Sequence, residues 1–252
     1  MDILQFSENM DALIPKTLSE PWDNDGIMTL PRRNAEVKKT VIALDATDAC
    51  IEKAEEIKAD VTVTHHPLIF SPISSLSDTD PVCRRVIRAV RADISVFSYH
   101  TRLDCVENGV ADSLIRALGF TQFDTFCKYI KLGTLDRDTD FSEFSEKVSE
   151  LLSEKPMCMI KCGKVRKVAC APGSGKDFIK DAYDIGADTF VTGEVSHSAM
   201  IYCKELGMNL LCMTHYATER VVLKSLEEFV KKACPGIETY IFDFERVREY
   251  GI

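Results

Sequence analysis

Residues 39–66 read KTVIALDATDACIEKAEEIKADVTVTHH, a stretch in which strand-like and helix-like segments alternate and lead into two histidines. The apolar run KTVIALD predicts a buried strand, CIEKAEEIK at 50–58 predicts a short helix, and the β-branched run DVTVT predicts a second strand. That strand leads directly into His65 and His66. Pro67 then stops it, because proline has no N–H to donate to a neighbouring strand. The segment therefore joins a strand–helix–strand unit to a pair of histidines.

The same alternation of strand and helix runs through most of the chain. Further strands are expected at 94–99, 164–171, 188–192, 210–214 and 238–244, and further helices at 80–91, 108–118, 141–152, 176–185, 196–206 and 219–234. This pattern predicts an α/β fold in which helices cover mainly parallel or mixed sheets. The stretch 121–156 is more polar and has fewer strand signals, which indicates the start of a second lobe. We expect two interlinked α/β lobes, formed by 1–125 with 222–252 and by 126–221.

The composition excludes several classes of protein. At 252 residues, 45% hydrophobic and 28% charged, the chain has the make-up of an ordinary soluble globular protein. The net charge of −9 argues against a general nucleic-acid binder, which needs a basic face. An acidic start and the lack of an apolar run of about 18 residues argue against a secretion signal or membrane span. We therefore expect a cytoplasmic protein without a membrane partner.

The ten cysteines and a group of arginines have ordinary structural explanations. No Cys-x-x-Cys occurs, so a zinc site built from thiolates is improbable and reduced, mostly buried thiols are expected. Four arginines have the spacing of one outer helix face, for which a solvated surface is the expectation and a partner contact the alternative: Arg84, Arg85, Arg88 and Arg91.

All five histidines lie in short polar motifs that follow apolar, strand-like runs. The motifs are THHP at 64–67, YHTRLD at 99–104, TGEVSH at 192–197 and THYATE at 214–219. Imidazoles and carboxylates that meet at strand ends can bind borderline divalent metals at neutral pH. The clustering therefore predicts a metal site.

The individual residues allow more than one interpretation. His215 and Glu219 are four apart at a helix start and share one face, so they form either a ligand pair or a surface ion pair. His65 and His66 either bind one site at the strand end or point to opposite faces, one buried and one exposed. Asp104 is either a metal ligand or a helix N-cap.

Three further residues near these motifs are candidates for supporting roles. His100 is a candidate ligand, an orienting partner or a proton shuttle. Glu194 is a candidate general base, an orienting partner or a charge that favours a helix start. Trp22, the single tryptophan, lies in a polar turn, where it lines a pocket wall or packs on a neighbouring loop.

The run Gly173-Ser174-Gly175-Lys176 invites comparison with a phosphate-binding loop. A Walker A motif needs glycine where Cys170 stands and serine or threonine where Asp177 stands, so the motif is absent. What remains is a glycine turn before a helix start, a place that can receive an anion.

Taken together, these segments resemble the Nif-three-like family, many of whose bacterial members are called GTP cyclohydrolase 1 type 2 homologues. The matching segments are EPWDNDGI at 20–27, THHPLIF at 64–70, SYHTRLD at 98–104, APGSGKDFI at 171–179, TGEVSHSAM at 192–200 and THYATER at 214–220. They follow one another in the same order over nearly the whole chain. One segment departs from the family: KYIKLGTL at 128–135 lacks the expected glycine-arginine pattern, which puts in doubt any substrate contact made by that loop.

The resemblance implies a centre of two divalent metals in the cleft between the lobes. His65 and His215 would bind one metal, His66 and Asp104 the other, and Glu219 would bridge both. Nitrogen and oxygen ligands without thiolate allow zinc, iron, manganese, cobalt or nickel. The resemblance also implies a ring-shaped homohexamer.

The activity implied by the family name is hydrolytic opening of the imidazole ring of a purine nucleotide, with release of formate. His100 or Glu194 would then be the proton-transfer group. The alternative is a non-catalytic metal-binding scaffold, or a metal-handling or regulatory protein that acts through partners.

Overall fold

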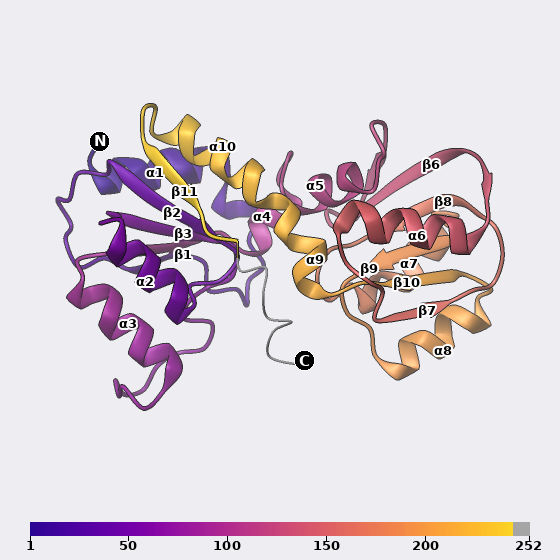
Figure 1. Cartoon of the computed structure of the whole chain (residues 1–252), viewed down its shortest axis with the longest axis horizontal. Helices are drawn as coiled ribbons and strands as arrows, with labels where there is room; N and C mark the ends of the chain where they lie inside the picture. Colours follow the sequence, from indigo (N-terminus) through magenta and orange to yellow (C-terminus); the bar gives the residue numbers. More distant parts are fainter. Residues whose placement is uncertain (244–252) are drawn as a thin grey trace. The chain divides into compact units, whose positions relative to one another are not determined.

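The structure, a computed structural model, describes residues 1–243. The chain divides into two compact units, each of which has its own sheet (Figure 1). The first unit comprises Met1–Val106 and the C-terminal segment from Leu223, and the second comprises Glu107–Val222. Within the described residues, none of the helices has both the length and the apolar character needed to cross a bilayer.

The first unit contains a five-stranded sheet with strand order β1-β4-β3-β2-β11. Its strands are β1 (Gly26–Thr29), β2 (Lys39–Ala43), β3 (Val61–Thr64), β4 (Ser95–Ser98) and β11 (Glu238–Ile241). The last four are parallel, and β1 runs antiparallel along the edge beside β4. The predicted strand–helix–strand segment thus forms the centre of this sheet, and β2 and β3 are buried throughout almost their whole length.

Helices cover both faces of this sheet. They are α1 (Ile3–Leu13), α2 (Asp48–Glu56), α3 (Pro81–Arg91) and α10 (Leu223–Ala233), with the short α4 (Thr101–Cys105) and η1 (Lys16–Leu18) at its edge. Helices α1 and α10 pack together on one face, and α2 and α3 pack together on the other (Figure 1). The predicted start of α3 is correct, because the Asp80 carboxylate caps the helix by accepting from the Cys83 amide at 2.8 Å.

The second unit contains a six-stranded mixed sheet with strand order β5-β6-β8-β9-β10-β7. Its strands are β5 (Asp124–Phe126), β6 (Ile130–Thr139), β7 (Cys158–Ile160), β8 (Val165–Cys170), β9 (Thr189–Thr192) and β10 (Asn209–Cys212). The central strands β8, β9 and β10 are parallel, and the outer strands are antiparallel to their neighbours. The mixed α/β architecture expected from the sequence is therefore present in both units.

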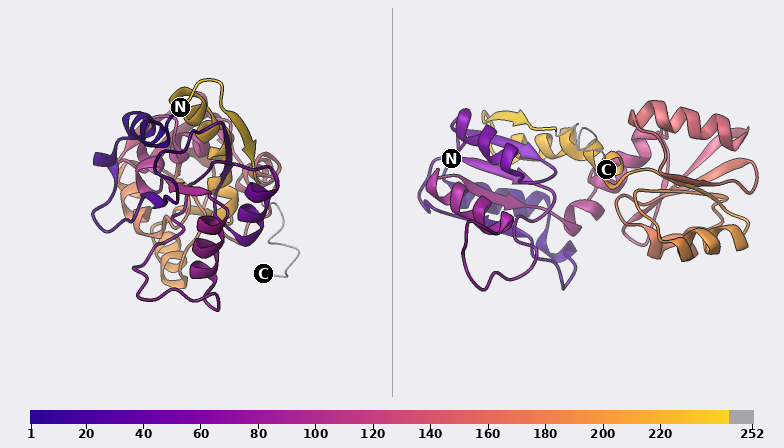
Figure 2. Two further views of the ribbon diagram at one scale, coloured as in Figure 1. Left: turned by 90° about the vertical axis from the view of Figure 1, so that its left-hand side faces the viewer. Right: turned by 60° about the horizontal axis from the view of Figure 1, so that its bottom comes forward.

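The helices of the second unit also lie on both faces of its sheet. They are α5 (Val110–Ala117), α6 (Phe141–Leu152), α7 (Ile179–Asp184), α8 (His197–Glu205) and α9 (His215–Glu219), with η2 (Lys176–Phe178) and η3 (Arg220–Val222). Val168 on β8 packs in the core under α5 and α6, whereas its neighbour Ala169 packs in the core under α7 and α8. Figure 2 shows the pink α6 and the orange α8 on opposite sides of the sheet.

Three predicted elements differ from those observed. The polar stretch after residue 121 was expected to be poor in strands, yet it supplies β5 and the ten-residue β6, whose outer half is polar because it is exposed. The helix expected at 219–234 is divided, since a short 3-10 turn at Arg220–Val222 separates α9 from α10. The last strand ends at Ile241, and residue 244 of the predicted strand lies outside the described residues.

The cysteines fit the prediction of reduced, mostly buried thiols. All ten are free, and six of them are buried. Burial raises the pKa of the Cys50 thiol to about 12, so this side chain behaves as a small apolar group.

A buried arginine joins three separate parts of the first unit. Arg102 has no exposed side-chain surface, and its Nη1 donates to Asp11 on α1 at 2.6 Å and to the carbonyl of Ile14 at 2.9 Å. Its Nε lies 3.0 Å from Asp25, just before β1, and its guanidinium lies over the Tyr99 ring at 4.5 Å. These contacts fix the turn at the start of α4.

The buried ion pair predicts a large loss of stability on replacement of Arg102. Arg102→Met leaves Asp25, which is also buried, without its cation, and should lower the free energy of unfolding by about 3–5 kcal/mol. The control is Arg84→Met, which breaks an exposed pair with Asp48 and should change the stability much less, because solvent screens an exposed ion pair. Urea unfolding measures both. Equal losses in the two variants would show that Arg102 is not a structural anchor.

Candidate metal centre

Parallel strands bring several candidate side chains of the first unit to one edge of its sheet. Asp45 follows β2, His65 and His66 follow β3, and His100 follows β4. Because the carboxyl ends of parallel strands meet at the same edge, these residues become neighbours. Nitrogen atoms of the three histidines all lie within 4.8 Å of one another.

The two adjacent histidines lie side by side where β3 ends. Their ring centroids are 4.7 Å apart, and their amides donate to the carbonyls of Ala43 and Leu44 at 3.3 and 2.9 Å. His65 is buried and His66 is partly exposed. The alternative in which the two rings point to opposite faces is wrong, since both rings contact His100 at centroid distances of 5.3 and 5.6 Å.

Each histidine of this cluster has its Nδ1 bound to an oxygen acceptor. His65 Nδ1 donates to the Tyr99 carbonyl at 3.0 Å, and because a carbonyl can only accept, the neutral ring carries its lone pair on Nε2. His66 Nδ1 pairs with Asp45 at 2.9 Å. Metal-binding histidines in proteins are held in the same way, through the ring nitrogen that does not bind the metal.

His100 is held by an aspartate from a distant part of the sequence. The carboxylate of Asp23, whose side chain is fully buried, lies 2.8 Å from His100 Nδ1 and accepts from the Thr101 amide and hydroxyl. Burial by itself would raise the pKa of Asp23, but the hydrogen bonds from His100 and Thr101 outweigh it and lower the pKa to about 2. Asp23 is therefore an anion that fixes the orientation of the His100 ring.

Asp104 joins the same cluster from α4. Its Oδ1 lies 3.6 Å from His65 Nε2. It lies inside α4, and the following helix is preceded by Gly109 at its N-cap position, so the alternative role of Asp104 as that N-cap is wrong.

In the second unit, His215 and Glu219 lie together on the short α9. His215 Nε2 and Glu219 Oε1 are 3.0 Å apart, and Glu219 is buried, which a surface ion pair would not require. Glu194, which follows β9, lies 3.0 Å from His215 Nδ1. His215 thus resembles the histidines of the first unit in having an oxygen acceptor at Nδ1, and its Nε2 lies beside a second carboxylate, that of Glu219.

Two glycines allow the backbone to approach α9. A Cβ atom at Gly173 would collide with Glu219 Oε1, and one at Gly193 would lie 2.6 Å from Thr218 Oγ1. The carbonyl of Gly173 accepts from the amides of Gly193 and Glu194, both at 2.9 Å. The APGSGK and TGE motifs therefore position α9 and its side chains.

The two glycine amides of the turn at 173–176 donate within the second unit. The amide of Gly173 donates to Thr218 Oγ1 and that of Gly175 to Thr192 Oγ1, both at 3.0 Å. These two donors therefore hold the turn in place and are not directed toward an anion.

The fifth histidine stands apart from the others. His197 is exposed at the first position of α8, and among the described residues it belongs to none of the clusters that could bind a metal. Asp23 and Asp45 were not predicted as partners of the histidines. Asp45 ends a predicted strand beside another strand that ends in histidines, a signal that could have identified it.

The donor set is chemically suited to a metal ion. It consists of imidazole nitrogens with fixed Nδ1 partners and of carboxylate oxygens, a combination that suits borderline divalent ions such as zinc, iron, manganese, cobalt or nickel.

Comparisons with known proteins agree with the fold. The family model described as Duf34/NIF3 (NGG1p interacting factor 3) matches residues 1–247. A Clostridium perfringens protein named GTP cyclohydrolase 1 type 2 homolog is 30% identical over 92% of this chain and 90% of its own length. The Saccharomyces cerevisiae protein named NGG1-interacting factor 3 is 28% identical over 84% of this chain and 83% of its own. The solved structure titled "Reduced HcgD from Methanocaldococcus jannaschii" matches with a TM-score of 0.82 and 28% identity, covering 97% of this chain and 98% of that one.

The close approach at Gly173 predicts an effect of a single methyl group. Gly173→Ala should lower the free energy of unfolding by about 2–4 kcal/mol, because it combines strain at a φ of +58° with a collision against Glu219. Gly207→Ala is the matched control, since Gly207 has a φ of +69° and open space around its Cα, and it should cost about 1–2 kcal/mol. Urea unfolding measures the stability of both variants. Calorimetric titration with Zn²⁺ measures their zinc affinity, which should fall only in Gly173→Ala because Glu219 is displaced. Equal stabilities and equal zinc affinities would contradict the positioning role of Gly173.

The low pKa of Asp23 predicts a stability that depends on pH. Its pKa is lower in the folded state than the ordinary value of 3.8, so its contribution is present above about pH 4 and is lost as the pH falls through about 2. Asp23→Asn should therefore cost about 2 kcal/mol near neutral pH, and less as the pH falls from about 4 to 2. The exposed Asp78→Asn is the control. If the loss of stability in Asp23→Asn stays constant over this pH range, the pKa of Asp23 is not lowered by folding.

Proposed function

The chain belongs to the Duf34/NIF3 (NGG1p interacting factor 3) family, and on that premise we propose that it is a metal-dependent hydrolase with two divalent metal ions. The observation that carries the proposal is the set of hydrogen bonds that the histidines make through Nδ1. Four of the five have Nδ1 within 3.0 Å of a carbonyl or carboxylate oxygen, and the exposed His197 is the one outside this group. In each ring this leaves Nε2 as the nitrogen that can bind a metal.

The assignment of ligands follows the family resemblance, with each unit supplying a part. We propose that His65 and His215 bind one metal, that His66 and Asp104 bind the other, and that Glu219 bridges them. The neighbouring positions of His65, His66 and Asp104 in the first unit, and of His215 and Glu219 in the second, support it. A metal pair in such a site lowers the pKa of a bound water and polarises the bond to be cleaved.

The remaining polar groups have separate tasks. His100 is held by Asp23 and is partly exposed, so its Nε2 can take up or deliver a proton during hydrolysis. Glu194 contacts His215 Nδ1, and we propose that it acts through His215 by fixing the orientation of that ring. Of the two candidate proton-transfer groups, His100 is therefore preferred.

The proposed reaction is hydrolytic opening of the imidazole ring of a purine nucleotide. A first water adds to the ring carbon that lies between two nitrogens and opens one C–N bond, which leaves a formamide on the other nitrogen. A second water hydrolyses the formamide, so that the carbon leaves as formate and both nitrogens remain as amines. The name of the Clostridium perfringens relative supports this substrate class.

A second candidate is a metal-binding scaffold that acts through partners. The name of the yeast relative, NGG1-interacting factor 3, describes an interaction rather than a reaction and favours this alternative. The ring-shaped homohexamer implied by the resemblance is compatible with either function, and sedimentation of the purified protein tests it.

Metal analysis and turnover test the proposal together. The wild-type protein should bind up to two divalent metals per chain and release formate from GTP, whereas His215→Ala and Glu219→Ala should lose metal and at least about 100-fold in turnover. His197→Ala should resemble wild type in both measurements.

The outcomes separate the two candidates. Metal binding without formate release, with equal behaviour of all variants toward GTP, would favour the scaffold. Equal turnover by His215→Ala, Glu219→Ala and wild type would refute the catalytic assignment, and a wild-type protein without metal after loading would refute both.

A further inference from the structure

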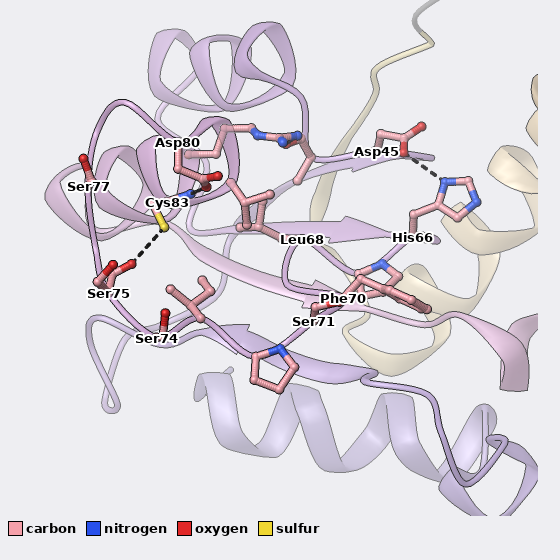
Figure 3. A pocket seen from close by; sticks show the side chains of 16 residues that line it. Asp45, His66, Leu68, Phe70, Ser71, Ser74, Ser75, Ser77, Asp80 and Cys83 are labelled. Carbon is pink, nitrogen blue, oxygen red and sulfur yellow. Dashed lines mark hydrogen bonds and ion pairs between the residues drawn. The ribbon is translucent and has the colours of Figure 1, made fainter.

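A cavity of about 540 Å³ lies beside the histidine cluster, entirely within the first unit. It is lined mainly by the segment between β3 and α3, and its size is typical of small-molecule sites. Figure 3 shows Asp45, His66 and Phe70 at one end and the serines of the loop, such as Ser74 and Ser75, at the other. The cavity thus has a histidine end and a hydroxyl-rich end.

Two large aromatic side chains are exposed at the histidine end. Trp22 is 63% exposed and Phe70 is 54% exposed, whereas large aromatic side chains are usually buried. Each lies edge-on to the other and to His100, with ring centroids 6.2 to 6.3 Å apart. An edge-on pair covers one face of one ring, and the large exposed fractions of both side chains leave further ring surface open for a flat ligand to stack upon.

The backbone around these rings is held firmly. Asp23, next to Trp22, binds Thr101 and His100, and the Asn24 side chain donates to the carbonyl of Ile69, next to Phe70. The polar residues beside the two rings are therefore engaged within the protein. Exposed rings on a fixed backbone form a preorganised surface, which lowers the entropy cost of binding.

One arginine that lines the cavity differs from its neighbours on α3. Arg84 pairs with Asp48 and Arg88 pairs with Glu55, which neutralises both charges. Arg85 instead donates to backbone carbonyls, those of Pro81 at 2.9 Å and of Ala46 at 3.2 Å. Among the described residues, Arg85 forms no salt bridge within 4.0 Å, and its charge acts at longer range on Asp48 and on Asp80, which also lines the cavity. Arg85 is therefore the arginine that can offer guanidinium donors to an anionic ligand in the cavity.

We propose that this cavity binds a substrate made of a flat heteroaromatic ring joined to an anionic group. The ring stacks on Phe70 at the histidine end, and the anionic group binds Arg85. The serine hydroxyls suit a polar linker such as a sugar. The proposal rests on the proposed function, since it places the ring beside His66 and His100, and it names Phe70 and Arg85 as residues that determine specificity.

The arginine contacts at the start of α3 correct the earlier expectation for this helix. Its four arginines were expected to share one solvated face, but Arg85 lines the cavity and the ion pairs of Arg84 and Arg88 hold α3 to α2. A matched control for charge on the same helix is therefore available.

Fluorescence of Trp22, the only tryptophan of the chain, reports on the histidine end of the cavity through its ring contact with Phe70. In the full-length protein, with and without EDTA treatment, GMP should quench this fluorescence with a saturable curve. Guanosine should bind about tenfold more weakly, because it lacks the anionic group, and ribose 5-phosphate should cause no quenching, because it lacks the ring.

Substitutions of Arg85 and Phe70 test the contact with the anionic group and the contact with the ring separately. Arg85→Ala should raise the Kd for GMP about tenfold or more and leave that for guanosine unchanged. Phe70→Ala should raise both about tenfold. Arg84→Ala and Tyr240→Ala, which remove an arginine and an exposed aromatic outside the cavity, should leave both unchanged. Circular dichroism spectra equal to that of wild type establish that the variants are folded.

Several results would overturn the inference. They are the absence of saturable quenching by GMP, an unchanged Kd in Arg85→Ala and Phe70→Ala, or equal quenching by ribose 5-phosphate. Binding is measured without turnover, so GMP binding in a protein that releases no formate would refute the proposed hydrolase alone. Formate release without these binding effects would refute the cavity assignment alone.

Discussion

The buried guanidinium of Arg102 is the interaction on which the geometry of the first unit depends. A charged group with no exposed surface is stable only when its partners are in place, and here the partners come from α1, from the turn before β1 and from the end of β4. Arg102 stands two residues after His100 and two before Asp104. The fixed guanidinium therefore holds the turn that carries both of these side chains. The burial of Arg102 thus also limits where His100 and Asp104 can lie.

The position of the histidines at the ends of strands was the feature of the candidate site that the sequence could predict. A parallel sheet places the carboxyl ends of β2, β3 and β4 at one edge, so the pairing of His65 and His66 with His100 follows from the alternation of strands and helices alone. The partners of the histidines could not be predicted in this way. Asp23 is 77 residues away from His100 in the sequence and reaches it only through a turn whose path depends on tertiary contacts.

Helix boundaries failed for a similar reason. The run from Glu219 onward has the apolar spacing of one continuous helix, yet the structure inserts a 3-10 turn at Arg220–Val222. The spacing of apolar residues gives no sign that Glu219 belongs to the second unit and Leu223 to the first. The 3-10 turn therefore coincides with the boundary between the two units, which the local spacing of apolar residues does not reveal.

The two units reach a similar arrangement by different means. In the first, side chains fix the histidines, through Asp45 and Asp23, at the ends of parallel strands. In the second, Gly173 and Gly193 remove side chains so that loop backbone can pack directly on α9. The first device tolerates changes in neighbouring side chains better than the second, because a glycine in close contact cannot gain a single carbon without displacing Glu219. The loops around α9 are therefore the part of the second unit in which the sequence has the least freedom to change.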